Sequence, residues 1–570
     1  MKYQWIFQRQ ADIKKIRTLS TQIKNLPQPI INILLQRGIT NLNEAKKFFN
    51  PSVNDLYDPF LMADMKKAVE RLDKALTNNE KILIYGDYDT DGTTAVALMY
   101  LFLKKFTNNI DYYIPDRYSE GYGISMQGIE YAAKNKFDLV IALDCGIKAI
   151  EQIEQANKYG IDFIICDHHT PGDQLPNATA VLDPKRKDCP YPFKELTGCG
   201  IGFKLTQAFT IHKKLNPSIA FEHLDLVAVS TAADIVPITE ENRILMYYGL
   251  KMLKNTRKKG LKALLSTAQI DKKEKIEVSD CVFKIAPRIN AAGRIKHAKN
   301  AVKLLITNSE TEAQEIANEI NLLNSQRQQI DRSIVNEIEG IFEKEPKLKN
   351  KHSTVLYNSN WHKGVVGIVA SKIIEKYYKP TIILTKSNNK ITGSARSVEG
   401  FDLYEAISEC EKLLENFGGH KYAAGLTLNE ENLDQFIECF ENSVKTKITD
   451  EQKQPKIIIS DILTFSQITE KFASLLTYFA PFGPGNPKPI FYTPSVRMIG
   501  ASKQIGKNNE HLKLELTDMT GNILEALAFG FGEYFNNMID KTFDICYTIQ
   551  YEKNNNPPIH LNIKDIKIRL

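Results

Sequence analysis

Short apolar runs alternate with helix-like segments between residues 76 and 245, and this alternation constrains the fold more than any other feature of the chain. Strands that alternate with helices form βαβ units and a mostly parallel sheet. Because the runs are almost continuously apolar, we expect strands that are covered by helices on both faces. The predicted strands are KILIYGDYD (81–89), IDYYIPDR (110–117), DLVIALDCG (138–146), IDFIICDHH (161–169) and DLVAVSTAAD (225–234).

The rest of the chain predicts several further elements. Ser309 followed by Glu312 signals a helix start, and apolar spacings of three and four continue to about residue 343. Such a helix would be roughly 50 Å long, which favours a connector between two lobes over a helix packed within one domain. Residues 350–450 read as a second α/β region, and 456–570 read as a small β-barrel, with the OB-fold as the leading candidate.

Composition argues against membrane and secreted classes of protein. No stretch approaches the ~18 uninterrupted apolar residues of a membrane span, and the N-terminus shows no secretory signal. The eight cysteines lack CxxC spacing, so neither a zinc ribbon nor a dithiol redox centre is indicated. Scattered cysteines are typical of reduced thiols, and we expect a cytoplasmic protein with no membrane partner. The net charge of +6 permits nucleic-acid binding without indicating it.

Carboxylates and histidines follow four of the predicted strands. Open α/β sheets bind ligands at the carboxyl ends of their strands, so we expect these side chains to meet. So many carboxylates would repel one another and raise their pKa values, and cations would relieve that repulsion. Oxygen ligands with one or two imidazoles suit two divalent ions such as Mn²⁺ or Mg²⁺. In chain order the side chains are Asp87, Asp89 and Asp91, then Asp144, then Asp167, His168 and His169, and finally Asp234.

Each of these residues also has a structural interpretation. Asp89 or Asp91 alone would be explained as a helix N-cap, but four clusters at four strand ends argue against that explanation for the set. His169 has two readings, as a hydrogen-bond partner of a ligand carboxylate or as a general acid near the leaving group. We interpret Cys145 and Cys166 as core packing. A two-metal carboxylate site activates a bridging water and stabilises a leaving oxygen, which fits phosphodiester hydrolysis.

Nine motifs then resemble known proteins. Four of them, GDYDTDG (86–92), DCG (144–146), DHH (167–169) and TAADIVP (231–237), resemble the motifs of the DHH phosphoesterase superfamily. The other five resemble the RecJ family of bacterial single-strand-specific 5′→3′ exonucleases, and the motif order is kept from about residue 50 to the end. They are RINAAGR (288–294), WHKGVVGIVAS (361–371), SARS (394–397), GGHKYAAG (418–425) and FGPGNPKPIF (482–491).

The resemblance implies a domain organisation. An N-terminal segment, which reads as helical and polar, covers residues 1–75, and the DHH catalytic domain covers 76–300. A long connecting helix lies within 301–345, followed by the DHHA1 α/β domain at 346–450. An OB-fold nucleic-acid-binding domain covers 451–570. The catalytic groove is implied between the DHH and DHHA1 domains.

The resemblance also implies roles for individual residues. The metal-site positions are Asp87, Asp89, Asp91, Asp144, His168 and Asp234, and His169 matches the second histidine of its motif. The residues expected to carry the chemistry are Asp89, Asp144, His168 and His169. The chain departs from some DHH relatives at Tyr85, near the place where those relatives have a histidine ligand.

A phosphate-binding set is expected in the second α/β region. Ser394 and Arg396 offer a hydroxyl and a bidentate guanidinium for a terminal phosphate. Gly418 and Gly419 would let backbone N–H groups approach a phosphate, with His420 as a further donor, although a Gly-Gly pair can also be a tight turn. This region resembles the 5′-phosphate pocket of RecJ-like enzymes.

Two further sets of residues are expected to contact nucleic acid. The first domain would contribute polar side chains to the same groove, namely Arg117, Arg288, Asn290 and Arg294. The predicted barrel offers aromatic side chains that either stack on bases or belong to its core, namely Phe491, Tyr492, Phe529 and Phe531.

The function implied by the resemblance is a metal-dependent exodeoxyribonuclease. It would degrade single-stranded DNA from the 5′ end and release 5′-mononucleotides in recombination and repair, with a single-strand-binding protein and a helicase as further partners. One alternative is a DHH/DHHA1 phosphodiesterase for oligoribonucleotides or cyclic dinucleotides, whose members usually lack a C-terminal β domain. Another is a replication scaffold that has lost its ligands. Every motif carboxylate is present here, which favours an active enzyme.

Overall fold

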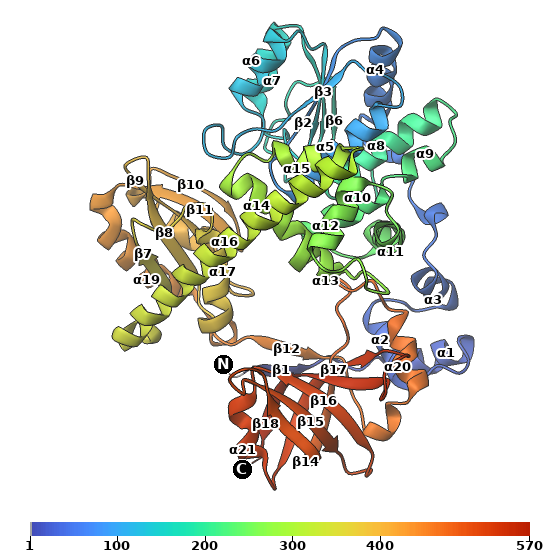
Figure 1. Cartoon of the computed structure of the whole chain (residues 1–570), viewed down its shortest axis with the longest axis vertical. Helices are drawn as coiled ribbons and strands as arrows, with labels where there is room; N and C mark the ends of the chain where they lie inside the picture. Colours follow the sequence, from blue (N-terminus) through green and yellow to red (C-terminus); the bar gives the residue numbers. More distant parts are fainter. Residues whose placement is uncertain (1–2, 570) are drawn as a thin grey trace. The chain divides into compact units, whose positions relative to one another are not determined.

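The computed structural model describes residues 3–569 and divides the chain into two compact units (Figure 1). The central unit comprises Lys47–Gln326 together with Ala480–Pro487. The flanking unit comprises the residues up to Lys46, Arg327–Phe479 and the residues from Lys488 onward. No helix within residues 3–569 is long and apolar enough to cross a membrane.

A five-stranded parallel sheet forms the middle of the central unit (Figure 1). Its spatial order is β3-β2-β4-β5-β6, so the chain changes direction across the sheet at β2, which is a topological switch point. β2 and β4 are buried along their whole length, which confirms the predicted cover on both faces. The strands are β2 (Ile82–Gly86), β3 (Ile110–Tyr113), β4 (Leu139–Leu143), β5 (Asp162–Cys166) and β6 (Ala180–Leu182).

Two groups of helices cover the sheet because alternate residues of each strand point to opposite faces. Ile82 and Ile84 pack with α5 (Thr90–Leu103), α8 (Gly198–His212) and α10 (Leu224–Ala233). Leu83 and Tyr85 pack on the other face with α6 (Met126–Lys134) and α7 (Ile150–Lys158). Cys145 and Cys166 are fully buried, which confirms their interpretation as core residues.

The strand predicted at residues 225–234 is wrong, because this segment is the buried helix α10. Every residue from Leu224 to Ala232 is buried, so the segment has no polar face to reveal a helical period. A short apolar run of this kind does not distinguish a buried strand from a buried helix. Asp234 therefore lies at the C-terminal cap of a helix instead of at the end of a strand.

The rest of the central unit is helical. Before the sheet lies α4 (Met65–Thr77), and after α10 come α11 (Glu240–Lys254), α12 (Lys259–Thr267), α13 (Val278–Asp280), a π-helical turn (Cys281–Ile285), α14 (Ala286–Ile295) and α15 (Lys299–Ile306). The segment Ala480–Pro487 returns to this unit, where the Ile238 N–H donates to the carbonyl of Pro484 at 2.7 Å.

The long predicted helix is present as α16 (Glu310–Lys344), and the Ser309 hydroxyl caps it by accepting from the Glu312 N–H at 3.2 Å. Its first half packs into the core of the central unit through Ala313, Ala317 and Ile320. Its second half packs through Ile338 and Phe342 against Trp361 in the flanking unit. One helix therefore belongs to two cores, which confirms the predicted connector.

The flanking unit contains a mixed five-stranded sheet in the order β10-β11-β9-β8-β7, with α17 (Val366–Tyr377), α18 (Leu403–Ser408) and α19 (Leu433–Lys447). β7 and β8 are parallel, and the other pairs are antiparallel. The strands are β7 (Thr354–Tyr357), β8 (Thr381–Ser387), β9 (Lys390–Arg396), β10 (Asn416–His420) and β11 (Ala423–Leu428). This arrangement confirms the second α/β region.

The same unit contains a closed barrel. Five strands follow the order β14-β15-β16-β18-β17, and β14 also pairs with β17. The first and last strands of this order are therefore joined, and the sheet closes into a barrel. This closure confirms the barrel that was predicted from the alternating C-terminal segments. The strands are β14 (Phe491–Ile505), β15 (His511–Thr517), β16 (Ile523–Phe529), β17 (Thr542–Tyr551) and β18 (Ile559–Ile568).

The sequence predicted a helical N-terminal segment, but the structure shows that this segment also contains a strand. Strand β1 (Gln4–Phe7) pairs in parallel with β12 (Lys456–Ile459), and the Trp5 indole donates to Asp565 at 2.8 Å. The pairing joins segments that are far apart in the sequence, so no local pattern could indicate it. The helices α1 (Ile13–Gln22), α2 (Gln28–Gln36) and α3 (Leu42–Phe49) follow β1.

Candidate metal centre

The carboxyl ends of the central strands meet in register at one edge of the sheet. Gly86 pairs with Leu143, Leu143 with Cys166, and Cys166 with Leu182. The residue after each strand is an aspartate, so the sheet itself places these four carboxylates side by side. They are Asp87, Asp144, Asp167 and Asp183.

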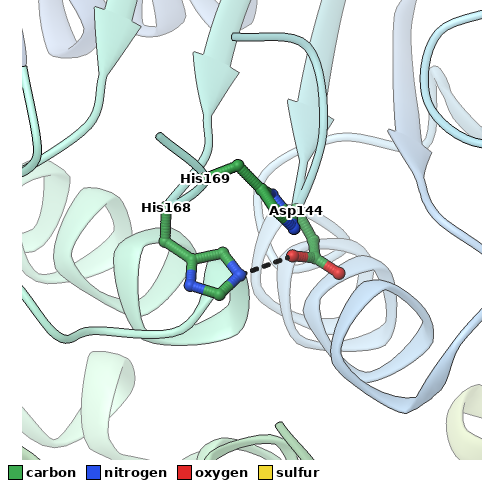
Figure 2. A group of neighbouring side chains, drawn as sticks. All are labelled: Asp144, His168 and His169. Atoms are coloured by element: carbon green, nitrogen blue, oxygen red, sulfur yellow. Dashed lines mark ion pairs between the residues drawn. The ribbon is translucent and has the colours of Figure 1, made fainter. Parts of the chain in front are cut away.

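His168 lies at the middle of the carboxylate cluster. Its Nε2 is 3.2 Å from an Asp144 oxygen, 3.7 Å from an Asp234 oxygen and 3.8 Å from an Asp91 oxygen. Figure 2 shows the Asp144 carboxylate and the His168 ring directed toward each other beyond the ends of the strands. Asp144 adopts a left-handed backbone conformation, with φ of 61°, which turns its side chain away from the strand direction.

Asp91 is fixed by the start of helix α8. Its carboxylate accepts from the backbone N–H of Gly198 at 2.7 Å and of Cys199 at 2.9 Å, and from the Ser230 hydroxyl at 2.7 Å. Backbone N–H groups at a helix N-terminus have no partner within the helix, so the Asp91 carboxylate fills that role for α8 and is held in place by it. A Cβ on Gly198 would lie 2.5 Å from the Cβ of Asp144, which only glycine avoids.

Asp89 and Asp87 complete the loop between β2 and α5. Asp89 caps α5 by accepting from the Gly92 N–H at 3.1 Å, so the N-cap interpretation holds for this residue while it also faces the cluster. One oxygen of Asp87 is buried and finds no hydrogen-bond donor among residues 3–569. Tyr85 takes no part, because its hydroxyl donates to the Gly123 carbonyl at 3.1 Å within the opposite core.

The electrostatics of the cluster indicate a place for cations. Burial, reinforced by neighbouring carboxylates, raises the pKa of Asp87, Asp89 and Asp144, and it raises the pKa of Asp234 to about 8. Burial lowers the pKa of His168 to about 4, so its imidazole is neutral, as a metal ligand must be.

The donor atoms also fit a metal ion geometrically. Ligand atoms of Asp91, His168 and Asp234 lie within 4.8 Å of one another, as do those of Asp144, His168 and His169. Within the described part of the chain, buried atoms of Asp87, Asp144 and His168 have no hydrogen-bond partner. Carboxylate oxygens with an imidazole form a donor set that suits Mn²⁺ or Mg²⁺.

His169 is oriented by Asp167 and Tyr122. Its Nδ1 lies 2.7 Å from Asp167, whose carboxylate also accepts from the Ile147 N–H at 2.9 Å. The Tyr122 hydroxyl donates to the Asp144 carbonyl at 3.0 Å and approaches a ring nitrogen of His169 at 3.1 Å.

The hydrogen bond between His169 and Asp167 favours a positive charge on the imidazole and a negative charge on the carboxylate. Burial alone would raise the pKa of Asp167, but the hydrogen bond from His169 holds it below its ordinary value. Burial alone would likewise lower the pKa of His169, but Asp167 raises it. The pair therefore favours a protonated His169 beside an ionised carboxylate.

Three of the four polar residues expected in the groove gather near the loop 86–92. The Arg117 guanidinium lies 4.9 Å from the centre of the Tyr88 ring, and Arg117 and Arg294 both oppose the rise in the pKa of Tyr88, which burial takes to about 12. Asn290 accepts from the Thr90 hydroxyl at 3.0 Å. Arg288 is directed elsewhere, because it donates to the Lys284 carbonyl at 2.6 Å and to Asn321 of α16 at 3.0 Å.

The predicted phosphate-binding set of the flanking unit lies on β9 and β10, which are separated by β11. Ser394 and Arg396 share one face of β9, and the Arg396 guanidinium donates to the Ser394 hydroxyl at 2.9 Å. Both lie beside the first turn of α17, where a Cβ on Gly367 would lie 2.9 Å from the Ser394 oxygen. Gly418 of β10 pairs with Gly425 of β11, which in turn pairs with Ser394 of β9.

The two glycines of this set differ. Gly419 has φ of 149°, and a Cβ there would lie 2.3 Å from the Ala423 carbonyl oxygen. Gly418 has no atom within 4 Å of such a Cβ and faces open space. Gly419 therefore makes the close hairpin, while Gly418 leaves room above the strand. His420 is exposed at the end of β10.

The four aromatic residues that were predicted in the barrel differ in how deeply they are buried. Phe491 is fully buried, and Tyr492 packs edge-on against Trp5. Phe529 is 52% exposed, and Phe531 is half-buried. Of the four, Phe529 is the most exposed, and its ring packs edge-on with that of His511.

Sequence reasoning missed several residues that shape the centre. Gly198, Ser230 and Tyr122 contact predicted site residues, and Asp183 stands at the end of β6 with its pKa raised to about 7 by burial. The glycine-rich TGCGIG (197–202) at the start of an apolar helix was the available signal for Gly198. Tyr122 and Ser230 carried no comparable signal.

Three family models match the chain in the order of its domains. The DHH family N-terminal domain matches residues 81–231, the DHHA1 domain matches 350–446, and the RecJ OB domain matches 459–565. The first model covers the parallel sheet and the carboxylate cluster except for Asp234, which lies just beyond its end. The second covers the mixed sheet with Arg396 and Gly419, and the third covers the barrel.

Proteins with curated descriptions and solved structures extend this similarity over most of the chain. The single-stranded-DNA-specific exonuclease RecJ of Escherichia coli is 33% identical over 527 residues, which cover 88% of this chain and 89% of that protein. The RecJ of Bacillus subtilis is 37% identical over 534 residues, which cover 93% of this chain and 66% of that protein. The crystal structure of RecJ in complex with Mn²⁺ from Thermus thermophilus superposes with a TM-score of 0.85 at 25% identity, covering 100% of this chain and 80% of that one. With its cluster of carboxylates, its three matching domains and these relatives, the chain belongs to the RecJ family of DHH phosphoesterases.

Proposed function

We propose that the chain is a metal-dependent exodeoxyribonuclease that degrades single-stranded DNA from the 5′ end and releases 5′-mononucleotides. The observation that carries this proposal is the convergence of Asp91, Asp144 and Asp234 on His168 at the edge of the sheet. Relatives named single-stranded-DNA-specific exonucleases, to which the chain is similar along most of its length, support the choice of substrate.

The metal ions would be held by the carboxylates and the neutral imidazole of the cluster. When bound, two divalent ions such as Mn²⁺ or Mg²⁺ would neutralise charge on the scissile phosphate and activate the attacking water. The buried donor atoms that lack partners within residues 3–569 support this assignment. The proposed ligands are Asp87, Asp89, Asp91, Asp144, His168 and Asp234.

The protein's own groups would orient the substrate and move a proton. Asp167 accepts at Oδ1 from Nδ1 of His169, so the proton available for transfer would be the one on the opposite nitrogen, Nε2. A protonated His169 would then donate to the leaving 3′-oxygen as a general acid. Tyr122 limits rotation of the ring from the other side.

Recognition of the 5′ end would fall to the two phosphate-binding sets. In the flanking unit, the terminal phosphate would contact Ser394, Arg396, Gly418, Gly419 and His420. In the central unit, the backbone of the strand would contact Arg117, Asn290 and Arg294. Arg288 would hold α14 in position beside these residues, because its guanidinium donates to Lys284 and Asn321.

The biological setting follows from the same proposal. We infer action in DNA recombination and repair in the cytoplasm, with a single-strand-binding protein and a helicase that supply the free strand. We also propose functional divisions at 1–75, 76–300, 301–345, 346–450 and 451–570, since these separate the carboxylate cluster, the connector, the phosphate pocket and the barrel.

The experiment is a cleavage assay with Mn²⁺ on 3′-labelled strands. The substrates are single strands with and without a 5′-phosphate, a 5′-blocked strand and a blunt duplex. We expect progressive shortening of the single strands with free 5′ ends alone. Equal cleavage of the blocked strand would refute 5′-end recognition, and cleavage of short oligoribonucleotides or cyclic dinucleotides instead would assign the site to the other substrate class.

The variant Asp89→Ala tests the metal centre in the same assay. Loss of one ligand should reduce cleavage by at least about 100-fold, while binding of single-stranded DNA remains measurable by fluorescence anisotropy. Asp173→Ala, in an exposed loop, is the matched control. Normal cleavage by Asp89→Ala would exclude this cluster as the catalytic metal site.

A further inference from the structure

The ring of Phe283 is unusually exposed for a large apolar side chain. It is 75% exposed, the highest value among the large hydrophobic residues that stand at the surface within residues 3–569. A single exposed apolar residue needs no special explanation by itself. The position of Phe283 in the fold, however, indicates a functional role.

Phe283 lies on the π-helical turn Cys281–Ile285, between α13 and α14. Such turns are rare and occur frequently at functional sites. Cys281 and Ile285 at the two ends of the turn are fully buried, so the residue between them is directed away from the core.

The turn is held firmly on both sides. Before it, Asp280 accepts from the Lys273 ammonium at 2.7 Å and 2.9 Å. After it, the Arg288 guanidinium donates to the Lys284 carbonyl at 2.6 Å. The exposed ring therefore stands on a fixed support, and a fixed ring loses little conformational freedom when a flat partner binds to it.

The same helical segment contacts the metal-binding loop. The Thr90 hydroxyl, between Asp89 and Asp91, lies 3.2 Å from the Ala286 carbonyl and 3.0 Å from the Asn290 amide oxygen. Ala286 follows Phe283 by three residues, which is about 4.5 Å along a helix axis. Asn290 follows it by about two turns. The ring therefore stands a short way along the helix from the carboxylate cluster.

We propose that Phe283 is a substrate-binding residue that stacks on a base of the single strand next to the scissile nucleotide. The inference rests on the proposed function, because it takes the strand's phosphate to lie at the carboxylate cluster. Every base has a flat face, so stacking on one aromatic ring would not select sequence. It would retain the strand after each cleavage and hold the next phosphodiester near the metal ions.

The test measures the coupling between the ring and one base. Binding is measured in an Asp89→Ala background, so that the DNA is not cleaved, with 5′-phosphorylated oligonucleotides that carry one abasic position at successive distances from the 5′ end. We expect Phe283→Ala to weaken binding of the intact strand about tenfold. One abasic position should weaken binding to the Asp89→Ala protein by a similar factor and have no effect on Asp89→Ala/Phe283→Ala.

Two further variants control the result. Phe283→Trp keeps a stacking ring and should restore affinity; its fluorescence should also be quenched by the intact strand and less by the abasic one. Tyr159→Ala removes another exposed aromatic side chain, which follows α7 at the opposite edge of the sheet, and should leave affinity unchanged.

The outcomes separate this inference from the proposed function. Unchanged affinity of Phe283→Ala, or equal loss at every abasic position in both backgrounds, would overturn the stacking role while leaving end-dependent shortening by the unmodified protein intact. A lower melting temperature with unchanged affinity would assign the ring to packing. Failure of the unmodified protein to shorten any single strand would instead refute the proposed function.

Discussion

At the scale of single residues, the centre depends on groups that hold the ligands as much as on the ligands. Asp91 is fixed by two backbone N–H groups and a hydroxyl, and His169 is fixed by Asp167 and Tyr122. Order along the chain predicted the carboxylates because each follows an apolar run. It could not predict the supporting groups, since Ser230 and Tyr122 reach the site through the folded structure alone.

Gly198 offers a direct test of this support. Replacing it by alanine would place a Cβ 2.5 Å from the Cβ of Asp144, which must displace either that carboxylate or the start of α8. We expect Gly198→Ala to weaken Mn²⁺ binding and cleavage by roughly 10- to 100-fold, as measured by calorimetry and by the strand assay. Gly172→Ala is the control, since its nearest atom is 3.8 Å away. Equal activity of the two variants would contradict the packing argument.

His223 predicts a pH dependence of stability away from the metal centre. Neither ring nitrogen has a partner in the described structure, and burial, with help from Lys258 and Lys105, lowers its pKa to about 3 from an ordinary 6.5. Between those values the unfolded chain binds a proton that the folded chain excludes, so stability is complete above pH 6.5 and falls as the pH falls.

The variant His223→Leu isolates this contribution. Below the ordinary histidine pKa, the unmodified protein should lose up to about 1.4 kcal/mol of stability for each pH unit relative to the variant. Melting temperatures of both proteins, measured across this range in one buffer series, give the difference. A difference that does not change with pH would show that the folded protein accepts the proton on His223.

At the scale of elements, the predictions succeeded where the pattern was local. Strands β2 to β5 of the central sheet, the capped helix α16 and the alternating barrel strands were all predicted from their own residues, whereas the short strand β6 was not. The segment 225–234 was wrong because complete burial removed the polar face that identifies a helix. Strand β1 was missed because its partner, β12, is distant in the sequence.

The hairpin of β10 and β11 contains a matched pair of glycines. Gly419→Ala would force a Cβ to within 2.3 Å of the Ala423 carbonyl oxygen, whereas Gly418→Ala meets no atom within 4 Å. We expect Gly419→Ala to distort the hairpin, at a cost of about 1–3 kcal/mol, and to abolish any preference for 5′-phosphorylated strands.

Gly418→Ala provides the comparison. It should leave the melting temperature unchanged and weaken the phosphate preference only if a phosphate approaches that backbone. Substrate preference is read from the ratio of cleavage rates on phosphorylated and hydroxyl-ended strands. Normal preference in both variants would remove the hairpin from phosphate recognition.

At the scale of the whole molecule, helix α16 makes the two units depend on each other. Its first half contributes Ile320 to one core, and its second half contributes Ile338 to the other. The prediction of a connector came from length and spacing alone. Which residues each half of the helix packs against depends on segments that are distant in the sequence, which no local pattern encodes.

A proline in the middle of α16 tests this dependence. Gln326 is exposed, so Gln326→Pro disrupts the helix without removing a core residue, at a cost of about 3 kcal/mol or more. We expect calorimetry to show two separated unfolding transitions and the strand assay to show strongly reduced cleavage. Gln326→Ala should behave as the unmodified protein, and a single unshifted transition in the proline variant would mean that the two cores do not share stability through α16.

The register of the central sheet has a consequence for how such a site can change over evolution. Adjacent strands lie about 4.8 Å apart, so the backbones of Asp87, Asp144 and Asp167 inherit a fixed spacing from the hydrogen bonds of the sheet. Loop sequences beyond those aspartates are free to diverge without altering that spacing. Insertion of one residue within β4 would shift Asp144 by about 3.3 Å along the strand, so the lengths of these strands are more constrained than most of the residues that compose them.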